Sequence, residues 1–391
     1  MPALDGLRGI AVLLVMLTHT WRMPKTGLSD RVVSFVVSIG WSGVELFFVL
    51  SGFLITGILL DSKGGHHYFR NFYARRMLRI FPLYYAMLAV SFVAAPLLPQ
   101  LVGRSLGNAN GQQLWYIFHL SNFSMAAHGA VAAAPLGVTW SLSVEEQFYV
   151  AWPFVVWVLP RRWLLRLCLV IALLSLACRI VLTAIHVNTT VVYLLTPSQL
   201  GAIAIGGAVA IALRSGGGIE RWALWARWVL VVTPFLIVAI GLVAMPGRYS
   251  LDLSNPLMGT IGMLILQLLY AAMIVAVLSG KPLPRLLRPI ETKALRACGR
   301  WSYAMYLFHT PLISVIYVVS LRHGWPLLLG SALPVQLLLT TTCIGITVTF
   351  AALSWRFYEQ PIIGLKRLFP VYPQRKTADG TAPVDEVSAA A

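Results

Sequence analysis

The chain has 391 residues, of which 58% are hydrophobic and 11% charged, with a mean hydropathy of +0.78. A soluble globular domain carries roughly 25% charged residues, so this composition excludes one and predicts an all-helical, polytopic membrane protein. The formal net charge of +17 does not indicate nucleic-acid binding, because the basic residues lie in short loops between apolar segments. Their expected partners are membrane lipid headgroups and a phosphorylated substrate.

Ten apolar runs are long enough to cross a hydrocarbon core of about 30 Å. They cover residues 4–23, 34–60, 77–99, 138–159, 163–186, 198–213, 228–246, 257–280, 300–321 and 331–355. The segment from Leu114 to Ala127 is shorter and more polar, and we predict a re-entrant or interfacial element there. We expect one transmembrane domain over residues 1–372 and a disordered cytoplasmic tail over residues 373–391.

The basic residues also predict an orientation, since lysine and arginine are enriched in short cytoplasmic loops. If both termini are cytoplasmic, 23 of the 30 lysines and arginines lie on the inner side and seven on the outer side. A full crossing by residues 114–127 would exchange the sides of the later loops and remove this bias. We therefore expect a multi-pass protein of the cell (inner) membrane with both termini in the cytoplasm.

The first apolar run contains two ionisable residues, Arg8 and His19. They are eleven residues apart, which places them about 20° apart around a helix and ~16 Å apart along it. A charge inside a membrane costs roughly 2.5 to 3.5 kcal/mol, so such residues indicate function. Histidine titrates near neutral pH, which makes His19 a candidate proton acceptor. The alternative is a buried histidine with satisfied hydrogen bonds and no chemical role.

The second run places Glu45 well inside the bilayer, between Gly43 and Gly52. Glycines allow close approach of a neighbouring helix, and the carboxylate needs a partner or a watery cavity. Glu45 is therefore either catalytic or part of a structural ion pair.

The loop before the third run leads into it as RRMLRIFP, in which Arg76 and Arg79 share a helix face and Arg75 points about 100° away. Guanidinium groups suit phosphate oxygens, so this pair is a candidate anion clamp. Arginines at the cytoplasmic end of a helix are also the commonest topology signal.

The motif TWSLSVEEQFY, from Thr139 to Tyr149, opens the fourth run with two carboxylates. Glu145 and Glu146 point about 100° apart, so one could orient a catalytic base while the other braces the helix. Ser141 lies four residues before Glu145, and Ser143 three before Glu146, so each serine is a candidate hydrogen-bond partner. We assign Trp140, Ser141 and Ser143 to substrate binding and both carboxylates to catalysis, against the alternative of two wet interfacial carboxylates.

A second intramembrane histidine, His309, lies in SYAMYLFHTP. Tyr306 is three residues earlier on the same face, and its hydroxyl could satisfy the imidazole without any catalysis. We assign both residues to substrate binding.

These motifs resemble the membrane acyltransferase-3 family of O-acyltransferases, whose members modify bacterial surface carbohydrates. The matching segments are LDGLRGIAVLLVMLTH, GVELFFVLSGFLI, RRMLRIFP, WSLSVEEQFY, SYAMYLFHTP and the closing YEQP at Tyr358 to Pro361. They extend over nearly the whole chain in the family order.

The resemblance implies acyl-CoA, usually acetyl-CoA, as the donor co-substrate and a carbohydrate or glycolipid hydroxyl as the acceptor, with no tightly bound cofactor. It implies His19 as the catalytic base, and Arg76 and Arg79 in acyl-CoA binding. We also assign Arg8 to acyl-CoA binding, because the partial positive charge of the first helix turn would help it to hold a phosphate. The chain departs from the family at TPSQLGAIAIG, where many members carry Arg and Asp in place of Gln199 and Gly201.

The rival function is a proton-coupled transporter or permease, because buried His, Glu and Arg also mark proton relays. The sequence shows no internal repeat that would favour it. The four cysteines, Cys168, Cys178, Cys298 and Cys343, lack a close metal-type spacing, so we expect no metal site.

Overall fold

The computed structural model describes residues 2–24, 27–94, 111–215, 218–243, 250–280, 287–320, 325–328 and 330–370. Its elements in these ranges are helices, and nine helical segments there are long and apolar enough to cross a membrane. The predicted all-helical, polytopic membrane fold is therefore confirmed. The tail expected over residues 373–391 lies outside the described residues.

The longer elements follow the chain in a simple order. They are α1 (Pro2–Thr20), α2 (Leu28–Val37), α3 (Gly43–Ser62), α4 (Tyr68–Ala89), α8 (Thr139–Val158), α9 (Arg161–Ala184), α11 (Thr196–Leu213), α12 (Gly218–Val243), α13 (Met263–Ser279), α15 (Lys293–Arg300), α16 (Ser302–Ser320) and α17 (Leu333–Ser354). Short elements connect them: η1 (Ser38–Ser42), α6 (Gln113–Ile117), α7 (Ser121–Ala127), α10 (Thr189–Leu194), η6 (Met258–Gly262), η8 (Trp355–Glu359), α18 (Gln360–Ile363) and η9 (Gly364–Leu368).

Within the described residues, each of the ten predicted spans is largely helical. The one that is absent from the nine apolar segments is α8, because its first half carries the polar side chains of the Thr139–Tyr149 motif. The segment from Leu114 to Ala127 forms the short helices α6 and α7, and the chain bends between them at His119, whose φ is 53°. Neither helix has the ~20 residues that a crossing needs.

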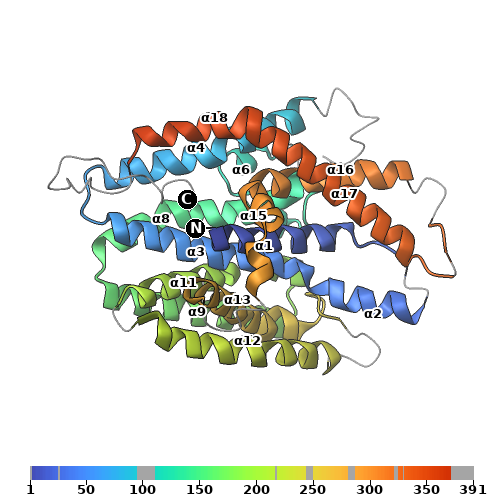
Figure 1. Cartoon of the computed structure of the whole chain (residues 1–391), viewed down its shortest axis with the longest axis horizontal. Coiled ribbons are helices and arrows are strands. Elements are labelled where there is room, and N and C mark those ends of the chain that lie inside the picture. Colours follow the sequence, from blue (N-terminus) through green and yellow to red (C-terminus); the bar gives the residue numbers. More distant parts are fainter. Residues whose placement is uncertain are drawn as a thin grey trace.

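Helices α1 and α3 run through the middle of the molecule, with α12 along one edge and α4 and α18 along the opposite edge (Figure 1). The packing of α3 against α11 depends on two glycines. A Cβ on Gly52 would lie 1.8 Å from the carbonyl oxygen of Ile203, and a Cβ on Gly206 would lie 1.9 Å from that of Val49. The close helix approach expected at Gly52 is confirmed.

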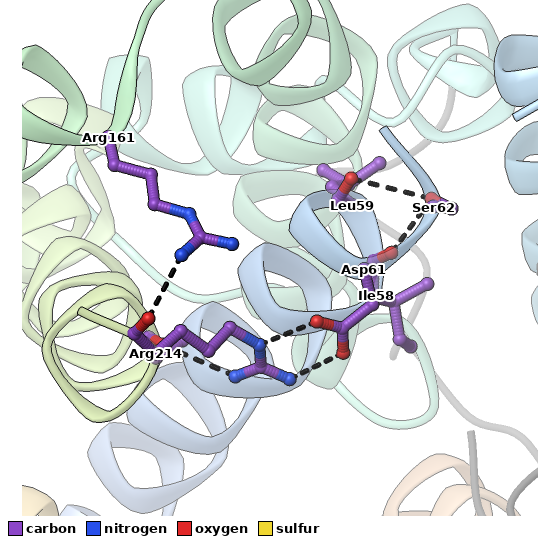
Figure 2. Close-up of polar contacts among 7 residues, drawn as sticks. Ile58, Leu59, Asp61, Ser62, Arg161 and Arg214 are labelled. Atoms are coloured by element: carbon purple, nitrogen blue, oxygen red, sulfur yellow. Dashed lines mark hydrogen bonds and ion pairs between the residues drawn. The ribbon is translucent and has the colours of Figure 1, made fainter. Parts of the chain in front are cut away.

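An ion pair joins α3 to the end of α11. Arg214 donates two hydrogen bonds to the carboxylate of Asp61, from Nε at 2.7 Å and from Nη2 at 2.6 Å, as Figure 2 shows. Arg161, the first residue of α9, donates to the backbone carbonyl of Arg214 at 2.9 Å. These contacts tie α3, α9 and α11 together at one end of the bundle.

The segment after α17 returns to α4. Tyr358 donates from its hydroxyl to the carbonyl oxygen of Pro82 at 3.1 Å, and Asn71 donates to the carbonyl oxygen of Pro370 at 2.6 Å. The last described residues of the chain therefore lie beside the arginine-rich first half of α4.

Candidate functional site

A cavity of about 80 Å³ lies between α1, α3, α4, α8 and α16. The polar side chains that line it are Arg8, Ser51, Arg76, Arg79, Ser141, Glu145, Tyr149, Ser302, Tyr303 and Tyr306. Apolar residues of α3, such as Phe47 and Phe48, form much of the remaining wall. Several candidate residues from motifs far apart in the sequence therefore meet at one place.

Three arginines face this cavity: Arg8 from α1, and Arg76 and Arg79 from α4. Arg76 lies over the ring of Tyr149, with its guanidinium carbon 5.7 Å from the ring centroid. No carboxylate of the described residues forms an ion pair with any of the three. Arg75 instead donates to the carbonyl oxygen of Phe369 at 3.1 Å, on the other side of α4. The expectation that Arg76 and Arg79 share a face and Arg75 points away agrees with this geometry.

Lys366 also belongs to this region, together with Arg8, Arg75, Arg76 and Arg79, and the sequence did not predict it. Lys366 of η9 is only 7% exposed, and its side-chain nitrogen lies within electrostatic range of Arg8, Arg75, Arg76 and Arg79. In the sequence it looked like one more cytoplasmic lysine. Only the return of the chain to α4 brings it here. This gathering of basic side chains is suited to an anion with several phosphate groups.

Glu145 and Glu146 have different surroundings. Glu145 lines the cavity and accepts hydrogen bonds from Ser51 at 2.9 Å and from the Tyr149 hydroxyl at 3.0 Å. Glu146 is not among the lining residues, and its Oε1 has no hydrogen-bond partner within the described ranges. The two neighbouring carboxylates therefore face different surroundings, as expected of residues that point about 100° apart, with Glu145 on the cavity side.

The prediction that Ser141 and Ser143 bond to these carboxylates was wrong. Ser141 shares a hydrogen bond of 2.5 Å with the Tyr306 hydroxyl, and Ser143 one of 2.9 Å with Ser121. Trp140 also lies outside the cavity lining and packs against Tyr193, with ring centroids 4.7 Å apart. Of the three residues assigned to substrate binding in this motif, only Ser141 reaches the cavity.

His19 and His309 contact each other beside the cavity. His19 Nδ1 lies 3.3 Å from His309 Nε2, and the two ring centroids are 4.9 Å apart. The ring of Tyr306, which lines the cavity, has its centroid 5.8 Å from that of His309. The histidine pair therefore lies next to the end of the cavity that Tyr306 forms.

The hydrogen bonds assign the protons on this pair. His309 Nδ1 is 2.7 Å from the carbonyl oxygen of Tyr306 and must donate, so the neutral ring accepts at Nε2. His19 Nδ1 is 2.8 Å from the carbonyl oxygen of Val15 and also donates. Its Nε2 then carries the lone pair that a general base requires.

Two expectations about these histidines are therefore corrected. His309 is held by the backbone of Tyr306 and not by its hydroxyl, which bonds to Ser141. His19 is oriented by the Val15 carbonyl and by His309, and not by a glutamate. The reason is local, since a carbonyl four residues earlier on the helix already lies within reach of Nδ1.

Glu45 belongs to a different cluster. It accepts a hydrogen bond of 2.8 Å from Gln267 of α13 and lies within electrostatic range of Arg179. It is fully buried and does not line the cavity. The structure thus separates Glu45 from the catalytic group in which the sequence analysis placed it.

The fold and this site define a multi-pass membrane protein whose bundle encloses a basic cavity with a histidine pair beside it. The model of the acyltransferase domain family matches residues 1–355, which is most of the chain. The chain therefore belongs to this family of membrane acyltransferases, and the resemblance drawn from its motifs is confirmed.

Similar proteins carry more specific names. YrhL of Bacillus subtilis is 32% identical over 92% of this chain and 54% of its own length. The peptidoglycan O-acetyltransferase OatA of Listeria monocytogenes is 28% identical over 92% of this chain and 55% of its own length. An O-acetyltransferase OatA of Staphylococcus aureus is 25% identical over 96% of this chain and 60% of its own. The chain thus spans just over half the length of these relatives. No solved structure matches it.

Proposed function

We propose that this protein transfers an acetyl group from cytoplasmic acetyl-CoA to a hydroxyl of a cell-wall glycan of the peptidoglycan type at the outer side of the inner membrane. The observation that supports this most is a single cavity with a cluster of positive charge at one end and the His19–His309 pair beside the other. Acetyl-CoA has matching ends, because its phosphates are polyanionic and its thioester lies at the tip of a long arm.

In this proposal the donor phosphates contact Arg8, Arg76, Arg79 and Lys366, as guanidinium and ammonium groups bind phosphate oxygens by charge-assisted hydrogen bonds. The pantetheine arm lies along Phe47 and Phe48 toward Tyr306. Arg8 lies about 16 Å from His19 along α1. A bound donor would therefore extend along most of that helix, with its phosphates at Arg8 and its thioester near His19.

The chemistry requires one base. His19 Nε2 takes the proton of the acceptor hydroxyl as the oxygen attacks the thioester carbonyl. The C–O bond forms, the C–S bond breaks, and the departing thiolate takes the proton back from the imidazolium. Both His19 and His309 end the cycle neutral, with His309 holding the His19 ring throughout.

In this proposal the donor and the acceptor reach the site from opposite sides of the membrane. With both termini in the cytoplasm, Arg8 lies near the inner surface and His19 near the outer one. An acetyl group made in the cytoplasm would then be delivered outside without a separate carrier. Acetyl-CoA supplied only to the inner face of sealed, oriented vesicles should support transfer, and supplied only to the outer face it should not.

The catalytic test is acetyl transfer by purified protein in nanodiscs. His19→Ala should lower the rate by about 10²- to 10⁴-fold, the range of general-base catalysis. Arg76→Ala and Arg79→Ala should raise the KM for acetyl-CoA. Arg75→Ala is the matched control, because this arginine faces away from the cavity. Undiminished transfer by folded His19→Ala protein would refute the mechanism, and an unchanged donor KM in both arginine variants would remove the clamp.

A further inference from the structure

Arg22 lies just beyond the end of α1, next to the residue that carries the proposed base. Its side chain is exposed, and its Nε donates a hydrogen bond of 3.2 Å to the carbonyl oxygen of His19. Its guanidinium carbon lies over the ring of Tyr317 of α16, 5.4 Å from the ring centroid. These contacts place a positive charge within electrostatic range of the His19 imidazole.

A buried polar network fixes the segment that carries Arg22. The backbone N–H of Arg22 donates to Oε1 of Gln336 in α17 at 3.1 Å. Nε2 of Gln336 donates to the carbonyl oxygen of Thr20 at 2.8 Å and to the Tyr317 hydroxyl at 3.0 Å, and that hydroxyl donates to the same carbonyl. Both Gln336 and Thr20 are fully buried. The position of Arg22 is therefore determined by α16 and α17 as well as by α1.

The arginine held in this way has donors to spare. An arginine near the end of a helix can bond to the last carbonyls of that helix, and Nε of Arg22 does so. Its Nη1 and Nη2 form no hydrogen bond or ion pair with the part of the chain that the structure describes. These two nitrogens form a planar fork that binds a carboxylate through two parallel hydrogen bonds.

The charge of Arg22 also bears on the proposed chemistry. His19 becomes a cation when it takes the proton of the acceptor hydroxyl, and a second positive charge nearby makes that state less favourable. No carboxylate within the described ranges pairs with Arg22 to offset its charge. A negative group on the acceptor would offset it, and only while the acceptor is bound.

We propose that Arg22 binds a carboxylate of the acceptor glycan, and this rests on the function proposed above. The carboxylate lies on the reacting sugar or on its neighbour, because Arg22 contacts the residue that carries the base. A neutral glycan leaves the charge of Arg22 uncompensated beside the imidazolium. It is therefore both a weaker ligand and a slower acceptor.

The test compares two forms of one tetrasaccharide. It alternates N-acetylglucosamine with N-acetylmuramic acid, whose lactyl group carries a carboxylate, and in the second form each carboxylate is converted to its methylamide. Binding to the full chain in nanodiscs is measured by calorimetric titration, and transfer by release of CoA from acetyl-CoA. Wild-type protein should bind the carboxylate form about 5-fold or more tightly than the methylamide. Arg22→Gln should bind both forms equally, with the KM for acetyl-CoA unchanged.

Arg22→Lys keeps the test valid if Arg22→Gln fails to fold, because lysine retains the charge and removes the fork. It should lower the preference by half or more. The matched control is Arg31→Gln, which removes the charge of an exposed arginine in the neighbouring helix α2. This control should leave the preference unchanged. A full preference in either Arg22 variant would overturn the assignment, as would an equal loss in Arg31→Gln.

The two proposals fail in different ways. Selective binding of the carboxylate form with no acetyl transfer to either form would refute the proposed reaction and leave the Arg22 site standing. Transfer at equal rates to both forms, with equal binding, would support the reaction and refute the site. Chitotetraose with a phosphate at its reducing end is the third probe. If wild-type protein binds it more tightly than the carboxylate form and Arg22→Gln does not, Arg22 is a phosphate site and the carboxylate assignment is wrong.

Discussion

His309→Phe tests the role of the histidine pair most sharply. Phenylalanine keeps a flat ring of similar size against His19, whose centroid is 4.9 Å away. It removes the nitrogen that shares the single N–H of His19 Nδ1 with the Val15 carbonyl. The lost hydrogen bond is 3.3 Å long, at the weak end of the range, and is worth about 1 kcal/mol. The shorter bond to the Val15 carbonyl remains and preserves the tautomer of His19. We therefore expect kcat to fall about 5- to 10-fold.

Single-turnover acetyl transfer measures this effect without interference from product release. The KM for acetyl-CoA should not change, because His309 lies beside the end of the cavity opposite the arginines. In protein that already carries His19→Ala, His309→Phe should have no further effect, since the residue acts through His19. A loss as large as that of His19→Ala would instead make His309 a proton-transfer group. An unchanged rate would remove it from the site.

Three further predictions concern stability. Asp61→Asn should lower the free energy of unfolding by less than about 1 kcal/mol, because the ion pair with Arg214 is about one-third exposed (28% and 34%) and solvent screens it. The midpoint of chemical unfolding in detergent, measured at several salt concentrations, tests this. A larger loss of stability that does not depend on salt would contradict it. Gly52→Ala should lower the free energy of unfolding by about 1 to 3 kcal/mol, because the added methyl group clashes with the Ile203 carbonyl. An unchanged unfolding midpoint would show that α3 and α11 can separate freely. Burial lowers the pKa of His119 to about 4, below the ~6.5 of an unfolded histidine. The folded state therefore keeps its full stability from the neutral, buried His119 above pH 6.5, and it loses that stability as the pH falls toward 4. His119→Phe should remove up to about 3 kcal/mol of that acid sensitivity, and unfolding midpoints with the same pH slope in both proteins would refute it.

Helix geometry made part of the site predictable. Arg76 and Arg79 line one cavity because residues three apart share a helix face. Arg8 reaches the same cavity, while His19 lies further along α1 beside His309. The spacing within each helix was sufficient to pair Arg76 with Arg79 and Arg8 with His19, but it could not show that the two helices meet at one cavity.

Partners from different helices could not be inferred in this way. The rule of neighbours four apart favoured Ser141 as the partner of Glu145, but Ser51 of α3 takes that position. Ser141 has alternatives at hand, because serine hydroxyls in helices bond readily to the carbonyl three or four residues earlier, here Val138. Lys366 was missed for a related reason, since its burial depends on how the end of the chain packs on α4.

The glycine contacts between α3 and α11 limit which parts of the molecule can move. Gly52 and Gly206 each face a backbone carbonyl of the other helix, so sliding by even a fraction of a turn would drive a side chain into the partner backbone. Helix α3 carries Ser51 toward the basic cavity and Glu45 toward Gln267 and Arg179. The basic cavity and the buried Glu45 are therefore carried by the same rigid unit at a constant separation. Any opening that admits a donor or releases a product must come from the helices around this unit, with α1, α4, α8 and α16 as the candidates.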